Sequence, residues 1–179
     1  MRISSFSTIA LVALLAFHGQ AAAQTMPRPT DASRPEDGLL ERPGLQDLVD
    51  AQVERDGQGL TRALGDPDPA VRARAAFALA SVQERDAVPV LLDLLVDAEP
   101  RVRADAAFAL GQTADSTVAG RLLEALAGES RPAVRRALLE ALGKTGDRAS
   151  LLRLAVLEAG PEETGALGLA LGRYGLRGV

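Results

Sequence analysis

The sequence contains no cysteine and a single histidine, His18. Without cysteine the chain can form neither a disulfide framework nor the lipid anchor of a lipoprotein. His18 lies in an N-terminal segment that we expect to be removed on export, so the mature chain has no histidine either. The usual general base near neutral pH, the thiolate nucleophile and the common zinc and copper ligands are then all missing. We therefore expect no catalysis, no cofactor and no metal site.

The N-terminal segment has the pattern of a secretory signal peptide. Arg2 provides a positive charge, residues 9–17 (IALVALLAF) form an apolar run too short to span a bilayer, and residues 20–23 (QAAA) form a small-residue cleavage pattern. We interpret residues 1–23 as the signal peptide, with a mature chain that starts at Gln24 in the periplasm or outside the cell. An uncleaved N-terminal anchor is the alternative.

The charge of the chain does not favour nucleic acid as a partner. The formal net charge of −4 becomes −5 when the segment that contains Arg2 is removed. Positive and negative side chains are interleaved along the mature chain, whereas a face that binds nucleic acid would be basic.

Residues 24–38 (QTMPRPTDASRPEDG) contain three prolines and almost no apolar side chains. Such a segment cannot bury enough surface to offset its ordering entropy, so we predict a disordered, proline-rich linker. The remaining residues, 39–179, are predicted to form one folded domain.

An internal repeat dominates this domain. Residues 71–79 (VRARAAFAL) and 102–110 (VRADAAFAL) are nearly identical and lie 31 residues apart. A third copy, residues 134–142 (VRRALLEAL), follows after 32 residues, and residues 163–171 (ETGALGLAL) form a degenerate fourth copy. Periods of this length are typical of solenoids, in which each unit buries its apolar face against its neighbours.

Each unit is predicted to contain two helices joined by a turn that carries acidic residues and proline. Leucine-rich first helices are expected at residues 59–64, 88–95, 118–126 and 151–157. The turns lie at residues 66–69 (DPDP), 97–100 (DAEP) and 129–132 (ESRP). Proline is tolerated in the first turn of the second helix, which the acidic residues cap and which we expect to begin at the Val-Arg pair. Strands are not expected, because alanine dominates and no run alternates with period two.

Upstream of the repeats, a half-polar helix is predicted to cap the stack. Leu45, Leu48, Val49 and Val53 recur at helical spacing, with acidic residues and Arg55 on the other side. A helix of this kind shields the open end of a solenoid from water.

The segments DPDPAVRARAAFALA (residues 66–80) and DAEPRVRADAAFALG (residues 97–111) resemble the short HEAT-like repeats first recognised in phycobilisome lyases. The resemblance covers about residues 56–175. It implies an all-α, right-handed solenoid of the armadillo type, made of about four helix pairs with the Val-Arg helices lining the concave side. Similar repeats serve many partners, so the resemblance implies a fold rather than an activity.

Phe77 and Phe108 occupy the same position in successive repeats and lie away from the apolar stripe of their own helices. Stacked repeats would place them side by side on the concave surface. The pair is either an exposed interface hot spot or a pair of core rings buried between repeats, and both interpretations are open at this point. The predicted partner-binding stripe consists of Arg74, Phe77, Asp105, Phe108, Arg136 and Glu140.

A regular series of charges accompanies the repeats. The acids of the turns are Asp66, Asp97 and Glu129, and the arginines that follow the repeat valines are Arg72, Arg103 and Arg135. Complementary charges at regular intervals are explained by stacking, so we predict structural ion pairs within and between repeats rather than an anion or metal site. An exposed pair would contribute under about 1 kcal/mol.

The C-terminal repeat is the least regular. Residues 164–174 (TGALGLALGRY) contain three glycines and no charge before Arg173, so the segment lacks the polar outer face of a cap. Either this end packs against another copy or another chain, or the chain is the front portion of a longer protein. Glu162 and Glu163, after Pro161, are expected in the first turn of the last helix, where the helix dipole favours acids.

These patterns predict a non-catalytic protein–protein interaction scaffold of the cell envelope or exterior. The scaffold would bind an unknown protein partner along its concave face and would bind no nucleic acid, and self-association through the C-terminal repeat is a further expectation. The alternatives are the adaptor part of a larger secreted enzyme and a lyase- or chaperone-like accessory factor for cofactor attachment.

Overall fold

The computed structural model describes residues 44–176. The predicted signal peptide, the predicted linker and residues 39–43 and 177–179 of the predicted domain lie outside the described residues. Within residues 44–176 every regular element is a helix. No helix of this part of the chain combines the length and the apolar character needed to cross a membrane.

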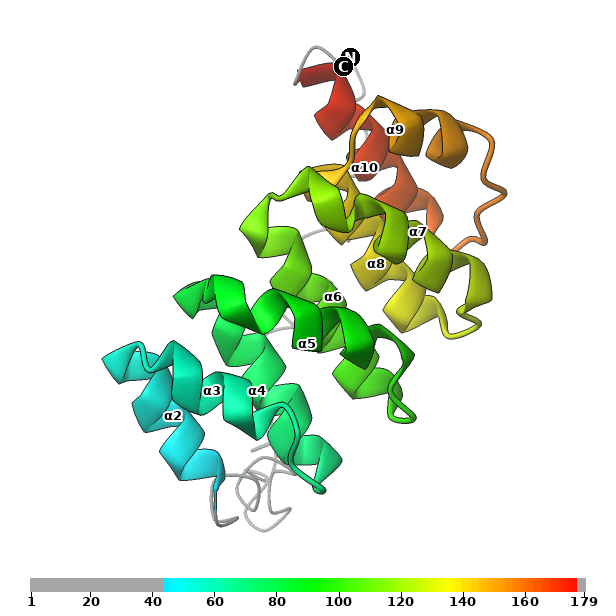
Figure 1. Ribbon diagram of the computed structural model, residues 1–179. Helices are drawn as coiled ribbons and strands as arrows, with labels where there is room; N and C mark the ends of the chain where they lie inside the picture. Colours follow the sequence, from blue (N-terminus) through cyan, green and yellow to red (C-terminus); the bar gives the residue numbers. More distant parts are fainter. Residues whose placement is uncertain (1–43, 177–179) are drawn as a thin grey trace, which may run out of the picture. The chain divides into compact units, whose positions relative to one another are not determined.

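The helices form pairs that repeat along the chain, with one extra helix in front of them, α2 (Leu45–Glu54) (Figure 1). The first helices of the pairs are α3 (Gly57–Ala63), α5 (Val88–Asp93), α7 (Ala119–Gly128) and α9 (Arg148–Ala155). Short 3-10 helices adjoin two of them: η1 (Arg85–Ala87), η2 (Leu94–Val96) and η3 (Ser116–Val118). The second helices are α4 (Pro69–Val82), α6 (Pro100–Thr113), α8 (Pro132–Thr145) and α10 (Thr164–Leu176). The α-solenoid of helix pairs behind an N-terminal helix is therefore confirmed.

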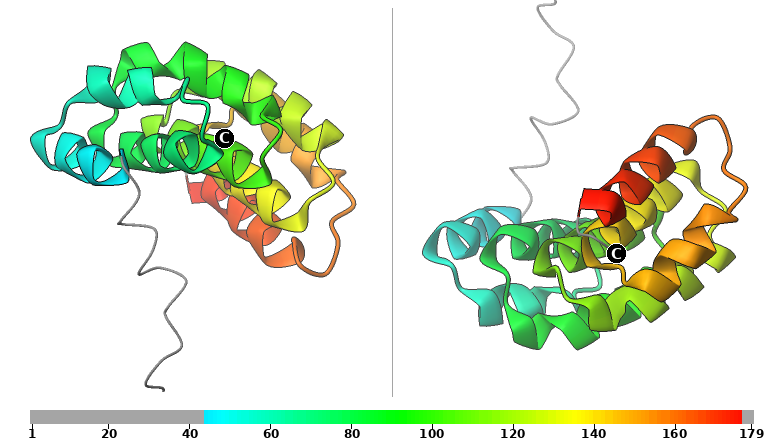
Figure 2. Two further views of the ribbon diagram at one scale, coloured as in Figure 1. Left: turned by 90° about the horizontal axis from the view of Figure 1, so that it is seen from below. Right: turned by 90° about the horizontal axis from the view of Figure 1, so that it is seen from above.

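The described helices lie in two layers. Helices α2, α4, α6, α8 and α10 pack side by side in one layer, which we call the inner row, and α3, α5, α7 and α9 form the outer row. Both views of Figure 2 show the inner row on the inside of the curve that these helices follow. The second helices thus line the concave side, as the resemblance implies.

Three inner-row helices begin at a proline. Pro69, Pro100 and Pro132 each take the first helical position, two residues before the repeat valine and so earlier than the Val-Arg pair suggested. Proline suits this position because its fixed φ is helical and its missing N–H would have no partner there. The side chain of Asp68 accepts the N–H of Ala70 at 2.8 Å and caps α4, whereas α6 and α8 have no side-chain cap.

Successive inner-row helices meet along what we call the seam, the side of each helix that faces the next repeat. Two glycines mark the closest contacts. A Cβ on Gly111 would lie 2.9 Å from the Cα of Ala141, and a Cβ on Gly143 would lie 2.7 Å from the Cα of Ala170. Both positions therefore need glycine because the backbone of the following helix occupies the space of a side chain.

Helix α2 packs against α3 and α4 at the N-terminal end of the described stack. Leu45 and Leu48 are buried, as predicted, but Val53 is 77 % exposed and does not share their stripe. A step of about 100° per residue turns Val53 roughly 80° away from Leu45, toward solvent.

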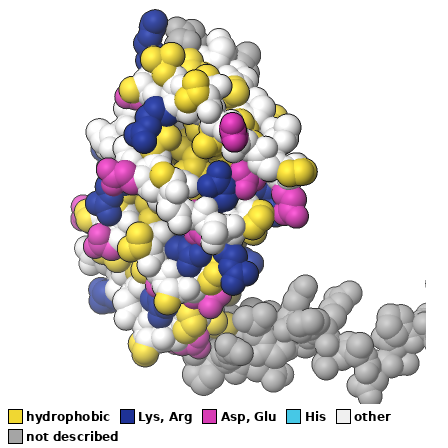
Figure 3. All heavy atoms as spheres, turned by 90° about the vertical axis from the view of Figure 1, so that its right-hand side faces the viewer, with side chains coloured by type: hydrophobic (Ala, Val, Ile, Leu, Met, Phe, Trp, Pro, Cys, Tyr) yellow, Lys and Arg dark blue, Asp and Glu magenta, His cyan; other side chains and the backbone are white. Residues whose placement is uncertain are grey.

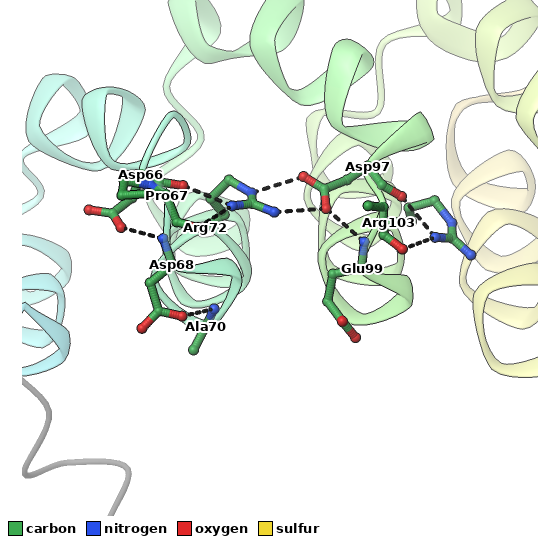
Figure 4. A network of polar contacts seen from close by, with 9 residues as sticks. Asp66, Pro67, Asp68, Ala70, Arg72, Asp97, Glu99 and Arg103 are labelled. Atoms are coloured by element: carbon green, nitrogen blue, oxygen red, sulfur yellow. Dashed lines mark hydrogen bonds and ion pairs between the residues drawn. The ribbon is translucent and has the colours of Figure 1, made fainter.

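The charged series forms a ladder of ion pairs between successive repeats. Figure 4 shows the first of them, between Arg72 and Asp97. Arg72 donates from Nε and Nη2 to the two carboxylate oxygens of Asp97, at 2.9 and 3.0 Å. Its Nη1 donates to the backbone carbonyls of residues 66–67 in its own turn. Arg103 repeats the arrangement with Glu129 at 2.7 and 3.2 Å. Each arginine thus joins the turn of its own repeat to the turn of the next.

These ion pairs are half-buried, although the sequence suggested exposed ones. The side chains of Arg103 and Glu129 are 16 % and 6 % exposed. The hydrogen bond from Arg103 lowers the pKa of Glu129, although burial opposes this shift. Burial by itself would raise the pKa of Asp97, but hydrogen bonds from Arg72 and from a backbone N–H hold it below its usual value. Asp97 and Glu129 are therefore kept ionised, and removing an arginine would leave a half-buried carboxylate without its cation.

The last pair of the ladder uses a position that the sequence did not indicate. Arg135 donates from Nε to Glu163 at 2.7 Å, and Glu163 is only 7 % exposed. This glutamate aligns with the repeat valine, not with the acid of the turn. Helix α10 begins at Thr164, so the prediction that Glu162 and Glu163 lie in its first turn is wrong. The connection from α9 is longer than the earlier turns, and α10 does not begin at Pro161, which takes the place of the earlier prolines. Glu163 reaches Arg135 from the end of that connection.

Candidate functional site

Two phenylalanine rings stack on the inner row, at the centre of the predicted stripe. The ring centroids of Phe77 on α4 and Phe108 on α6 lie 5.6 Å apart, with 15° between the ring planes. Phe77 is 44 % exposed, whereas Phe108 is partly buried against the core. The two interpretations left open by the sequence therefore apply to different rings: Phe77 presents an apolar surface to solvent, and Phe108 supports it from below.

A cation lies over each end of this ring pair. The guanidinium carbon of Arg74 is 5.9 Å from the centroid of Phe77, and Nζ of Lys144 is 5.3 Å from the centroid of Phe108. Lys144 also forms an ion pair with Glu140 at 3.0 Å, which holds the ammonium group in place. Contacts between cations and ring faces are attractive and orient the rings. The result is a preorganised column of cation, two rings and cation across three helices.

Arg74 and Asp105 lie deeper than the predicted stripe implies. Nη2 of Arg74 donates to the side-chain oxygen of Gln52 at 2.6 Å, and burial lowers the pKa of the guanidinium group. Asp105 is 8 % exposed and accepts a hydrogen bond from Nε of Arg101 at 2.6 Å. Burial raises the pKa of Asp105, although the hydrogen bond from Arg101 opposes this shift. Both groups therefore support the surface from beneath, and Arg101, with its side chain 71 % exposed, is the one that faces solvent.

Arg136 and Glu140 both lie on α8 but in different surroundings. Glu140 joins the ring pair through Lys144, as described above. Arg136 lies nearer the start of the helix, where its Nη1 is 3.8 Å from the carboxylate of Glu162. It also lines an open cavity of about 710 Å³ between α6 and α8. The cavity lining includes Arg101, Ala104, Pro132 and Ala133. The structure thus groups five of the six predicted residues around the rings and sets Arg136 beside a neighbouring hollow.

Three contributors were missed in the sequence: Gln52, Arg101 and Lys144. Lys144 follows Glu140 by four residues on one helix, a spacing that indicates an ion pair and could have revealed it. Arg101 likewise precedes Asp105 by four residues. Gln52 gave no such signal, because α2 is not a copy of the repeat and its register against α4 is set only by packing.

The surface shown in Figure 3 carries Lys and Arg side chains interspersed with Asp and Glu along the length of the described helices. No broad area of one sign is visible from this side. The view agrees with the interleaved charges of the sequence.

Comparison with known protein families identifies the family to which this stack of helix pairs belongs. A family model described as HEAT repeats matches residues 57–143 and 95–165, which together cover more than half of the chain. The chain belongs to the HEAT repeat family. Its HEAT repeats begin with α3 and reach the first turn of α10, so α2 precedes the matched region. Membership in this family indicates a protein-interaction scaffold at the level of general role.

Among the solved structures that share this fold, one matches most of the chain. It is the complex of CpcE and CpcF of phycocyanin lyase from Nostoc sp. PCC7120, with a TM-score of 0.63 and 22 % sequence identity. The similarity covers 86 % of this chain and 70 % of that chain. At this identity the likeness shows a common fold. No curated protein sequence matches the chain.

Proposed function

We propose that this chain is a non-catalytic scaffold of the cell envelope or exterior that binds another protein along its inner row. The observation that supports this proposal best is the exposed ring of Phe77, stacked on Phe108 and flanked by fixed cations. Binding hot spots are enriched in aromatic side chains that sit in preorganised surroundings with charged groups at the rim. A ring held in place loses little conformational entropy when a partner covers it.

The location outside the cytoplasm rests on the pattern of residues 1–23. Fusing residues 1–43 to a reporter enzyme that is active only after export should give reporter activity outside the cytoplasm. N-terminal sequencing of the exported chain is expected to begin at Gln24. A reporter that remains in the cytoplasm would contradict this part of the proposal without touching the binding surface.

Replacing Phe77 and Phe108 together with serine is expected to weaken partner binding by roughly 30-fold or more, since the loss of one hot-spot side chain costs about 2 kcal/mol. The partner would be captured from the envelope fraction of the source organism on the immobilised chain, identified, and titrated by calorimetry. Because Phe108 is partly buried, the variant should also lose about 1 to 3 kcal/mol of stability, less than a fully buried pair would lose.

The matched control is Val96→Ser with Leu152→Ser, which removes two apolar side chains that are 77 % and 63 % exposed on the outer row. This control should bind like the wild-type chain. Equal binding by the wild-type chain and the phenylalanine variant would show that the partner does not bind at the inner row. A collapse of helical circular dichroism in the variant would instead assign both rings to the core.

A second candidate function is a lyase-like or chaperone-like accessory role in cofactor attachment. The observation that favours it is the shared fold with the phycocyanin lyase complex. Neighbouring reading frames for bilin or haem synthesis would favour this role over a general scaffold. A catalytic domain encoded beyond Val179 would instead favour an adaptor within a larger secreted enzyme.

The self-association expected from the C-terminal repeat also remains a proposal. Its support lies on α10, where Leu169, which takes the register position of Phe77 and Phe108, is 67 % exposed.

A further inference from the structure

The seam of the last repeat is open, although the same seam is covered in every earlier repeat. In repeat register, Gly168 of α10 corresponds to Ala76, Ala107 and Leu139, all of which are fully buried. Gly168 itself is exposed, and a Cβ built on it would meet nothing within 4 Å. The position that packs repeat against repeat therefore has no neighbour among the described residues.

Gly172 allows the same comparison with its counterparts in the earlier repeats. It corresponds to Gly111 and Gly143, whose missing side chains admit the backbone of the next helix. No atom lies within 4 Å of a Cβ on Gly172. Its two counterparts show what this position is used for in this protein, which is contact with the backbone of another helix. The open seam of α10 is thus of the same type as the two glycine contacts between helices of the inner row, at Gly111 and at Gly143.

The composition of this face does not suit contact with water. Residues 164–172 (TGALGLALG) carry no charge, and Leu169 stands on the open side with 67 % of its surface exposed. Each glycine in a solvated helix costs about 1 kcal/mol relative to alanine, so three of them weaken α10 unless something covers the face. Leu169 therefore adds exposed apolar surface beside the open packing face.

We propose that α10 packs against α10 of a second copy of this chain through the face formed by Gly165, Gly168, Leu169 and Gly172. This inference rests on the self-association proposed above and names its helix face and its occupant; it uses neither the ring pair nor another protein. Gly165, Gly168 and Gly172 lie within about 60° of one another around the helix, with Leu169 at their edge.

Two features favour a second copy as the occupant. A two-fold interface must be complementary to itself, and here Leu169 lies between glycines along the helix axis, with Gly165 and Gly168 before it and Gly172 after it. An antiparallel pair centred between residues 168 and 169 places Leu169 against Gly168 of the second copy and Gly165 against Gly172. Interfaces between identical chains are also more apolar than those between different proteins, in keeping with a face that carries no charge.

The test is sedimentation velocity of the purified chain over a wide range of concentration. The wild-type chain should form dimers, and Gly168→Glu should raise the dissociation constant of the dimer by roughly 10-fold or more. Gly120→Glu is the matched control, since Gly120 is also an exposed helical glycine with nothing within 4 Å, but it lies on α7. This control should dimerise like the wild-type chain. Both variants replace glycine with a better helix former, so folding is retained and can be verified by circular dichroism.

Single cysteines then test the geometry, because the natural sequence has none. Under a mild thiol oxidant, Gly168→Cys should form a disulfide-linked dimer, since the antiparallel arrangement brings the two copies of this residue within about 7 Å. Gly165→Cys should cross-link poorly by itself and well with Gly172→Cys. A wild-type chain that stays monomeric at every concentration would overturn the proposal and leave a different helix as the occupant of the seam. A dimer that persists unchanged in Gly168→Glu would overturn it as well.

Discussion

Arg103→Leu is expected to lower the free energy of unfolding by about 1 to 3 kcal/mol, more than the loss of an exposed ion pair costs and less than the loss of a fully buried one. Arg103 lies in the middle of the ladder. It donates to both carboxylate oxygens of Glu129 and, through Nη1, to the backbone carbonyls of residues 97–98. The variant leaves the carboxylate of Glu129, which is 6 % exposed, without its cation. Urea unfolding followed by circular dichroism measures the loss.

Two control variants separate the ladder from a general effect of losing an arginine. Arg121→Leu removes an arginine from an exposed pair with Glu124, in which the side chains are 50 % and 71 % exposed, and should cost less than about 1 kcal/mol. The double variant Arg103→Leu with Glu129→Leu removes both charges and should recover part of the stability, because no charge is then stranded. A loss below about 1 kcal/mol for Arg103→Leu would show that the ladder is dispensable.

Gly143→Ala is expected to destabilise the chain by about 1 to 3 kcal/mol, as overpacking of a tight contact does. The direction of this stability change is informative, because alanine in place of glycine inside a helix normally stabilises a protein by about 1 kcal/mol. Here the added methyl group would lie 2.7 Å from the Cα and 3.1 Å from the Cβ of Ala170. Helices α8 and α10 would have to separate, and the unfolding midpoint in urea reports the cost.

Gly172→Ala provides the control at the same position of the next repeat. Nothing lies within 4 Å of its added Cβ, so this variant should be as stable as the wild-type chain or more stable by up to about 1 kcal/mol. The measurement is made at low protein concentration, where the proposed dimer is dissociated. If the two alanine variants changed stability equally and in the same direction, close approach of the inner-row helices would not be what sets their packing.

The repeat could be predicted from the sequence because each copy has the same local pattern of residues. The copies at residues 71–79, 102–110 and 134–142 share spacing and composition, and prolines mark each helix start. The stacking of Phe77 on Phe108 also followed from register alone, since equivalent positions of adjacent repeats must lie side by side. Export, the linker and partner binding were predicted from composition and pattern, and they stay predictions.

The burial of individual side chains did not follow from the sequence. Asp105 and Phe108 occupy the same helix face as exposed neighbours, yet the adjacent helix covers them to different extents. The burial of Arg74 could not be predicted for the same reason, because its hydrogen bond to Gln52 depends on α2, a helix outside the repeat.

The sequence by itself determined that this protein has no cysteine chemistry and that its folded part is a series of helix pairs with a ring pair in register. The lack of histidine outside the segment that contains His18 is likewise a property of composition. Only the tertiary structure decided that the ladder is half-buried, that Glu163 completes it and that no described residue covers the seam of α10. These features depend on distances between segments about 30 residues apart, which the packing of one helix on the next fixes and no local pattern encodes.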